Sequence, residues 1–280
     1  MNINKNSLQA RINKLSKELG LHANVLLVSF FFDAFIARLA KSKYAKNFVF
    51  KGGFYLATLL GVNKRYTADI DFLLQKESLT EERLKEIFTE IISVDVNDSI
   101  TFDISGISTI REEDTYGGFS ILLTGHLENI RQSFHVDIAT GDPITPSAIE
   151  YSYQSLISHE TIAFQAYSLE TVIAENMQTI LARGVFNSRC KDYYDIYIIR
   201  QLQWDYIDKT NLKSAFEKTC SYRKTIFSKQ NIDETFEQVS NDTGMRIRWT
   251  SYAKKQSFAR DVSFDETVSA CKLVIENIFN

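Results

Sequence analysis

Apolar residues near the start of the chain recur at helical spacing. Four of them are separated by intervals of four, three and four positions: Leu8, Ile12, Leu15 and Leu19. This spacing predicts an amphipathic helix over residues 6–19 rather than a signal peptide. A second helix is expected over 23–41, where a mostly apolar run contains Asp33 and Arg38. The run is shorter than the ~20 residues of a membrane span, so we expect a buried helix and no membrane contact.

The pattern changes after residue 46 to short apolar runs. Residues 47–51 predict a strand that Gly52 and Gly53 break, and residues 54–60 predict a helix closed by Gly61. Residues 66–75 alternate between apolar and polar positions, as a strand with one polar face does. The segments that follow predict one helix and three strands, over 81–92, 100–110, 118–126 and 134–139. We therefore expect an α/β first half.

The second half has a different pattern. Pro143 and Pro146, the only two prolines, close the strand-rich region, and helical spacing dominates from Glu160 onward. Helices are expected over 169–184 and 188–201, with two or three more before the end of the chain. A boundary near 158 would divide the chain into two domains, 1–158 and 159–280, which suits its length of 280 residues.

Composition narrows the functional classes. The 32 Lys and Arg residues against 35 Asp and Glu give a net charge of −3, which excludes a uniformly basic nucleic-acid binder and leaves only local basic patches. The three cysteines fit neither a disulfide framework nor a zinc-ligand pattern, and the four histidines lack metal-ligand spacing. A cytoplasmic protein that folds without disulfides is the simplest interpretation.

Two carboxylates on the strand predicted over 66–75 are the first candidates for chemistry. Asp69 and Asp71 are two positions apart, so both side chains project from one face, while Ile70 and Phe72 face the core. Such a pair can hold the divalent ions used in phosphoryl transfer. A solvated pair of surface carboxylates would show the same pattern.

Gly52 and Gly53 strengthen the first interpretation because they lie at a strand-to-helix turn upstream of the carboxylates. Backbone N–H groups at a helix start can hold a triphosphate, and glycine lets the phosphate approach closely. Lys51 and Arg65 at the two ends of this segment could balance phosphate charge. A tight turn with two surface cations is the alternative.

The segment KGGFYLATLLGVNKRYTADIDF, residues 51–72, resembles the signature of the AbiEii/AbiGii toxin family, a branch of the DNA polymerase β-like nucleotidyltransferases. A second segment, residues 169–195, resembles the distal motif of the same family, a helix with Ala-Glu-Lys followed by R-x-K-D-x-x-D. The two segments carry the resemblance from about residue 45 to 200. Asn176 stands where the family usually has a lysine.

The resemblance implies an α+β fold: a polymerase β-like nucleotidyltransferase domain, with a mixed sheet flanked by helices, followed by a helical bundle. It implies that Mg²⁺ or Mn²⁺ is held by Asp69, Asp71 and a third carboxylate on a later strand. Alternation over 134–139 favours Asp137 for this position, with Asp142 as the fallback and a plain ion pair of Asp137 with Lys or Arg as the alternative. Catalytic roles would also fall to Lys191 and Asp192.

The remaining implied residues contact the nucleotide. This set is Lys51, Gly52, Gly53, Arg65, Thr67, Glu175 and Asp195. On the distal helix, Lys191 and Asp195 are spaced i, i+4, and a surface salt bridge would show the same spacing. The loss of the usual lysine at position 176 would weaken the neutralisation of phosphate charge, unless Lys191 substitutes.

These observations predict a toxin that transfers a nucleoside monophosphate from an NTP to an acceptor. RNA, and tRNA in particular, is the expected acceptor, with a protein or neighbouring-gene antitoxin as partner. Residues 245–260 carry five basic and no acidic residues, so they could clamp RNA while Trp249 or Tyr252 stacks on a base. Packing of these aromatic residues in the bundle core is the alternative. A catalytically weak protein that binds nucleotide, RNA or antitoxin is the second functional hypothesis.

Overall fold

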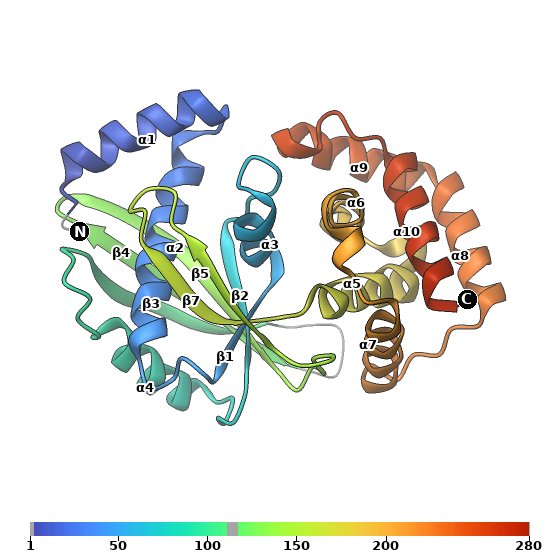
Figure 1. The fold of residues 1–280 in the computed structure, drawn as a ribbon, viewed down its shortest axis with the longest axis horizontal. Helices are drawn as coiled ribbons and strands as arrows, with labels where there is room; N and C mark the ends of the chain where they lie inside the picture. The colour runs from blue at the N-terminus through green and yellow to red at the C-terminus, as the bar shows by residue number, and fades with distance from the viewer. Residues whose placement is uncertain (1–2, 111–116, 280) are drawn as a thin grey trace. The chain divides into compact units, whose positions relative to one another are not determined.

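Alternating apolar and polar residues build a sheet whose two faces differ. The computed structural model of the chain describes residues 3–110 and 117–279. Within it, seven strands form one mixed sheet in the order β3-β4-β5-β2-β1-β7-β6 (Figure 1). The strands are β1 (Phe48–Lys51), β2 (Asp69–Leu74), β3 (Thr101–Ile110), β4 (Gly118–Leu127), β5 (Ile130–Thr140), β6 (Ile149–Gln154) and β7 (Thr161–Ala166). The predicted α+β architecture is confirmed.

Among the described residues, four helices belong to the same unit as the sheet. They are α1 (Lys5–Leu19), α2 (Ala23–Lys41), α3 (Gly52–Leu60) and α4 (Glu81–Ile92), close to the predicted positions. Phe35 of α2 stacks on Phe88 of α4 and contacts Phe134 of β5, and all three side chains are buried. α2 and α4 therefore cover one face of the sheet with an aromatic core.

α2 is apolar and long enough to cross a membrane by length and composition alone. Its side chains, however, pack inside the unit: Phe31, Phe32, Phe35 and Ile36 have no exposed surface. Asp33 and Arg38 are buried in the same helix. Packing against β5, β7 and α4 accounts for the apolar composition of α2, as predicted for a core helix.

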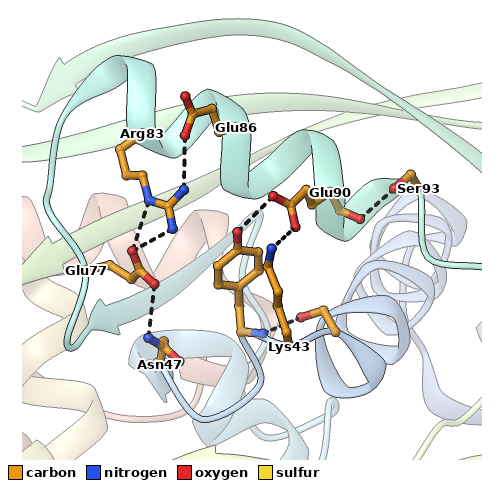
Figure 2. A network of polar contacts seen from close by, with 9 residues as sticks. Lys43, Asn47, Glu77, Arg83, Glu86, Glu90 and Ser93 are labelled. Carbon is orange, nitrogen blue, oxygen red and sulfur yellow. Dashed lines mark hydrogen bonds and ion pairs between the residues drawn. The ribbon is translucent and has the colours of Figure 1, made fainter.

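A network of charged side chains connects α4 with the residues just before β1 and just after β2. Arg83 donates hydrogen bonds to Glu77 at 3.0 and 2.9 Å, and Lys43 forms an ion pair with Glu90 at 2.6 Å (Figure 2). Tyr44 donates a further hydrogen bond to Glu90. Solvent screens exposed pairs of this kind, so the network fixes loop geometry more than it stabilises the unit.

The second unit is helical. It comprises residues 142–148 and 167–279, and its helices are α5 (Leu169–Arg183), α6 (Cys190–Gln203), α7 (Lys209–Tyr222), α8 (Lys229–Asn241), α9 (Thr243–Lys255) and α10 (Phe264–Phe279). Three short 3₁₀ turns lie between them: η1 (Gly184–Phe186), η2 (Trp204–Tyr206) and η3 (Ser257–Ala259). Four helices follow α6 in the described residues, where we expected two or three.

The division between the units differs from the expected boundary near 158. Residues 149–166 form the hairpin of β6 and β7, and β7 pairs in parallel with β1, so this segment belongs to the sheet. The two prolines suggested that the sheet had ended, and we expected helical structure from Glu160. The alternation of buried Ile162, Phe164 and Ala166 was the strand signal that this interpretation missed.

Candidate functional site

A row of polar side chains crosses four neighbouring strands of the sheet. Asp71 on β2 lies opposite Lys51 on β1 and opposite Asp137 on β5, and Asp137 in turn lies opposite Ser120 on β4. Directly opposed residues share one face of a sheet. The neighbours of Asp71 along β2, Ile70 and Phe72, are buried on the other face, as predicted. Strand register thus brings Asp71 and Asp137 together.

A second row lies beside the first. Asp69 is opposite His135, two residues before Asp137 on β5. The hydroxyl of Thr67 donates a hydrogen bond to Asp69 Oδ1 at 2.5 Å, so Thr67, predicted to contact nucleotide, holds the first carboxylate of the pair. Asp69, Asp71 and Asp137 are all half-buried. Their carboxylates occupy one solvent-accessible patch of the sheet.

The glycine turn lies directly against these carboxylates. β1 ends at Lys51 and α3 begins at Gly52, whose φ is +70°. A Cβ at Gly52 would lie 2.0 Å from Asp71 Oδ2, so any other residue would both strain the backbone and displace the carboxylate. Glycine is required here because the Asp71 carboxylate occupies the space that a Cβ would need.

Arg65 lies on the other side of the turn. A Cβ at Gly53 would lie 2.8 Å from the Arg65 guanidinium, and Arg65 donates a hydrogen bond to the carbonyl of Tyr66 at 2.5 Å. The side chain is buried, so it is not a loose surface cation. A guanidinium held beside a helix N-terminus is an arrangement suited to phosphate.

The electrostatics of Asp137 reflect this crowding. Burial raises the pKa of the Asp137 carboxyl, and the nearby carboxylates of Asp71 and Asp69 raise it further. The hydrogen bond from Ser120 and the charge of His135 act in the opposite direction. No Lys or Arg within residues 3–110 and 117–279 forms an ion pair with Asp137, so the ion-pair alternative for this residue does not hold. Carboxylates that repel one another attract a cation.

The donor set fits a hard divalent cation. All three side chains offer carboxylate oxygens, the ligands that Mg²⁺ and Mn²⁺ prefer. In the part of the chain that the structure describes, no group of three or more His, Cys, Asp or Glu side chains is placed so that it could hold a metal ion as it stands. Thr67 donates a hydrogen bond to Asp69, and Ser120 donates one to Asp137. The residues therefore fit the metal by chemistry and by strand register.

The distal residues lie in the second unit. Asp192, on α6, is 1% exposed and accepts a hydrogen bond from Arg189 Nε at 3.0 Å. Burial raises the pKa of Asp192, while Arg189 and Lys191 lower it. The fallback third carboxylate, Asp142, also belongs to this unit, where it forms an ion pair with Arg223 at 3.6 Å. Asp192 is thus buried in the second unit, and its expected catalytic role stays a prediction.

Three further predicted residues flank Asp192 in the same unit. Asp195 is 5% exposed, so an open surface salt bridge does not describe it. Lys191 is half-buried on the same helix. Glu175, on α5, forms an ion pair with Arg223 at 3.8 Å, next to half-buried Asn176. The predicted site residues thus form two groups, one in each unit.

The basic stretch, residues 245–260, contains both buried and exposed side chains. Trp249 is 4% exposed, contacts Phe264 and donates a hydrogen bond to the carbonyl of Val262, so it belongs to the bundle core. Arg246 is neutralised by Asp265. Lys254 and Lys255 are exposed at the end of the helix. Trp249 is therefore excluded as a base-stacking residue, whereas the two lysines can reach a phosphate.

Sequence reasoning missed two residues beside the carboxylates. The Ser120 hydroxyl lies 2.6 Å from Asp137 Oδ1 and 3.0 Å from His135 Nδ1. His135 was set aside because the histidines lack ligand spacing. Its alternation with Asp137 on one strand was the available signal, but the contribution of Ser120 depends on the pairing of β4 with β5.

Comparison with known proteins shows the family of the chain. Residues 34–270 match the family described as nucleotidyl transferase AbiEii toxin, type IV toxin–antitoxin system. The chain belongs to the AbiEii nucleotidyltransferase toxin family. The matched range contains both groups of predicted site residues. Transfer of a nucleotidyl group is the activity that defines this AbiEii protein's family.

Two crystal structures from Helicobacter pylori share the fold of this AbiEii protein. One is described as a candidate nucleotidyltransferase, with 14% identity and a TM-score of 0.50 over 92% of this chain and 98% of that chain. The other is JHP933, with 14% identity and a TM-score of 0.51 over 92% of this chain and 95% of that chain. No curated protein matches the chain significantly. At this identity the two structures support the fold alone.

Proposed function

We propose that this AbiEii protein transfers a nucleoside monophosphate from an NTP to an acceptor hydroxyl, at a centre built from Asp69, Asp71 and Asp137. The observation that carries the proposal is strand register: Asp71 lies opposite Asp137, with Asp69 two residues away on the same face. Neighbouring carboxylates of this kind have little structural reason to crowd together unless a cation joins them.

The reaction forms one phosphoester bond and breaks one phosphoanhydride bond. The acceptor oxygen attacks the α-phosphorus, its proton passes to solvent water, and pyrophosphate leaves. Asp69, Asp71 and Asp137 would hold a divalent cation, Mg²⁺ or Mn²⁺, which when bound would supply activation of the attacking oxygen and neutralisation of the leaving phosphate. The protein's own contribution is to fix the carboxylates and to position the triphosphate.

Backbone and cationic groups on the first unit are suited to the triphosphate. Gly52 and Gly53 lie at the start of α3, where backbone N–H groups have no carbonyl partner within the helix, and Arg65 is held against Gly53. Lys51 lies opposite Asp71 on the neighbouring strand. Together they would bind phosphate oxygens through charge-assisted hydrogen bonds and orient the α-phosphorus.

Three residues of the second unit are proposed to contact nucleotide, as the family resemblance implies. Lys191, Glu175 and Asp195 are the contacts, and Lys191 supplies the positive charge that Asn176 lacks. Buried Asp192 is assigned to holding Arg189. The Asn176→Lys variant should tighten NTP binding, measured by calorimetry with Mg²⁺ present. An unchanged dissociation constant would mean that Lys191 already fills this role or that the helix contacts no phosphate.

The central experiment uses the full chain, α-labelled NTPs and total RNA. The parent protein should transfer label in the presence of Mg²⁺ or Mn²⁺, and Asp71→Asn should not. Asp103→Asn is a matched control, because Asp103 is an exposed carboxylate on β3 of the same sheet. Label transfer by Asp71→Asn at the parental rate would refute the assignment.

RNA is the acceptor class that we propose, with tRNA as the first substrate to test. Lys254 and Lys255 are two exposed cations at the end of α9. Replacing both with Glu should weaken RNA binding, reduce its dependence on salt, and leave the melting temperature and NTP binding unchanged. RNA affinity that survives this charge reversal would move the acceptor surface elsewhere and favour a protein or small-molecule hydroxyl.

A second candidate function is a binding protein with little turnover, which acts by holding nucleotide, RNA or antitoxin. Asn176, in place of the family lysine, favours it. NTP binding without label transfer to any cellular fraction would support this candidate. We further propose that the chain acts in the cytoplasm and that the product of a neighbouring gene neutralises it, which co-expression during growth arrest tests directly.

A further inference from the structure

Ser120 connects two side chains of β5 on the face that carries the carboxylates. Its hydroxyl oxygen lies 2.6 Å from Asp137 Oδ1 and 3.0 Å from His135 Nδ1. Strand pairing fixes this geometry, because Ser120 is the register partner of Asp137 between two long antiparallel strands. The contact therefore follows from the sheet and not from a mobile loop.

The chemistry of the three groups sets the direction of these hydrogen bonds. An ionised carboxylate can only accept, so the single hydroxyl proton of Ser120 points to Asp137. The serine oxygen must then accept from His135, which places the imidazole proton on Nδ1. The result is a directed chain in which His135 donates to Ser120 and Ser120 donates to Asp137.

This chain acts on the carboxylate that most needs orientation. Asp137 lies opposite Asp71 and close to Asp69, and like charges would turn its carboxylate away from both. A hydrogen bond to Oδ1 opposes that rotation. Groups that orient metal-binding carboxylates in this way usually change metal affinity by about 10–100-fold when they are removed.

We propose that Ser120, supported by His135, is a positioning residue that holds the Asp137 carboxylate ready for a divalent cation. The proposal rests on the proposed function, because it takes Asp137 as a ligand. It adds two residues outside both family segments and gives each a defined role. His135 holds the serine hydroxyl in its donating orientation, and Ser120 holds the ligand.

Mn²⁺ binding to the full chain, followed by electron paramagnetic resonance of the free ion, tests this directly. Ser120→Thr and Ser120→Val have the same shape and differ in the hydroxyl. Thr should bind Mn²⁺ within about threefold of the parent, whereas Val should bind about 10-fold more weakly or worse. Nucleotidyl transfer by Val should recover as Mn²⁺ is raised, since the defect lies in filling the site.

His135 is tested by a similar pair. His135→Asn keeps an N–H donor near the position of Nδ1, and His135→Leu removes it, so Asn should retain more Mn²⁺ affinity than Leu. Ser133→Ala is the matched control: Ser133 lies on the same face of β5, but its hydroxyl bonds Thr124. This variant should bind Mn²⁺ like the parent.

The outcomes separate this inference from the function on which it rests. Equal Mn²⁺ affinity of the Thr and Val variants, with melting temperatures equal to the parent, would overturn the role of Ser120. Asp137→Asn reports on the ligand itself. If Asp137→Asn binds Mn²⁺ like the parent, the proposed metal centre fails; if it loses Mn²⁺ while Ser120→Val does not, only the positioning role fails.

Discussion

The carboxylates of the sheet and those of the helical unit are arranged differently. Asp71 and Asp137 are half-buried and opposite each other on adjacent strands, where the charge of Asp71 adds to the raised pKa of Asp137. Asp192 is almost fully buried on α6, but Arg189 from the preceding turn neutralises it. The first arrangement concentrates negative charge, and the second cancels it.

This difference is the reason why we propose the carboxylates of the sheet, and not Asp192, for the reaction. A buried carboxylate with a cation in place is satisfied by the protein itself. Carboxylates gathered on one face without a paired arginine are satisfied only when a cation arrives. In the sequence, the carboxylates of both units look equally like functional residues. Only the charges around each group distinguish them.

The largest expected effect separates activity from stability at Asp71. Asp71→Asn should reduce nucleotidyl transfer by at least about 100-fold, because several kcal/mol of transition-state stabilisation are lost with the ligand. The melting temperature should change little, since the removed charge also repelled Asp137. A variant that unfolds at lower temperature in proportion to its lost activity would make Asp71 a structural residue.

A third kind of buried carboxyl sharpens the comparison. Asp33 on α2 is bonded by the hydroxyls of Tyr153 and Ser155, and burial raises its pKa to about 6. The folded pKa exceeds the unfolded value of 3.8, so stability from this group is present below that value and lost as pH rises toward 6. Asp33→Asn removes the charge but keeps the acceptor for Tyr153.

Asp33→Asn should therefore be more stable than the parent at pH 7, on the order of 2–3 kcal/mol, with little difference near pH 4. Urea unfolding of both proteins at several pH values measures the change in their difference. A difference that is constant between pH 4 and pH 7 would show that Asp33 does not titrate in this range.

A substitution at Gly52, in the turn between β1 and α3, should lower both stability and Mn²⁺ affinity. Gly52→Ala places a Cβ 2.0 Å from Asp71 Oδ2 at a positive φ, so the carboxylate or the helix start must move. We expect a loss of about 1–3 kcal/mol in stability together with weaker Mn²⁺ binding. Gly106→Ala is the control, because a Cβ there meets nothing within 4 Å. Parental Mn²⁺ affinity in Gly52→Ala would separate the turn from the metal centre.

The smallest expected effect comes from breaking the ion pair of Arg189 with Asp192. Arg189→Met leaves Asp192 buried without this cation and should destabilise the protein by about 1–2 kcal/mol at pH 7, reduced because Arg189 is partly exposed. Asp192→Asn in the same chain should restore most of that loss. Additive effects of the two changes on the free energy of unfolding would mean that the residues are not coupled.

Local sequence patterns determined much of the first unit. Alternation placed Asp69 and Asp71 on one face of β2 and put Asp137 on the matching face of β5, and the two glycines marked the turn between β1 and α3. These features follow from backbone geometry over a few residues, so they can be read without knowing the fold. The missed hairpin of β6 and β7 shows the limit, since two nearby prolines outweighed a short alternating signal.

Tertiary structure alone decided which residues meet. That Asp71 lies opposite Asp137, that Ser120 reaches Asp137 and His135, and that Trp249 is buried all depend on pairing or packing between segments distant in sequence. A one-residue shift in register would move every side chain of a strand to the other face, and no local pattern specifies the partner strand. The sequence therefore determined which chemical groups each helix and strand carries. Strand pairing and helix packing decided which of these groups lie together.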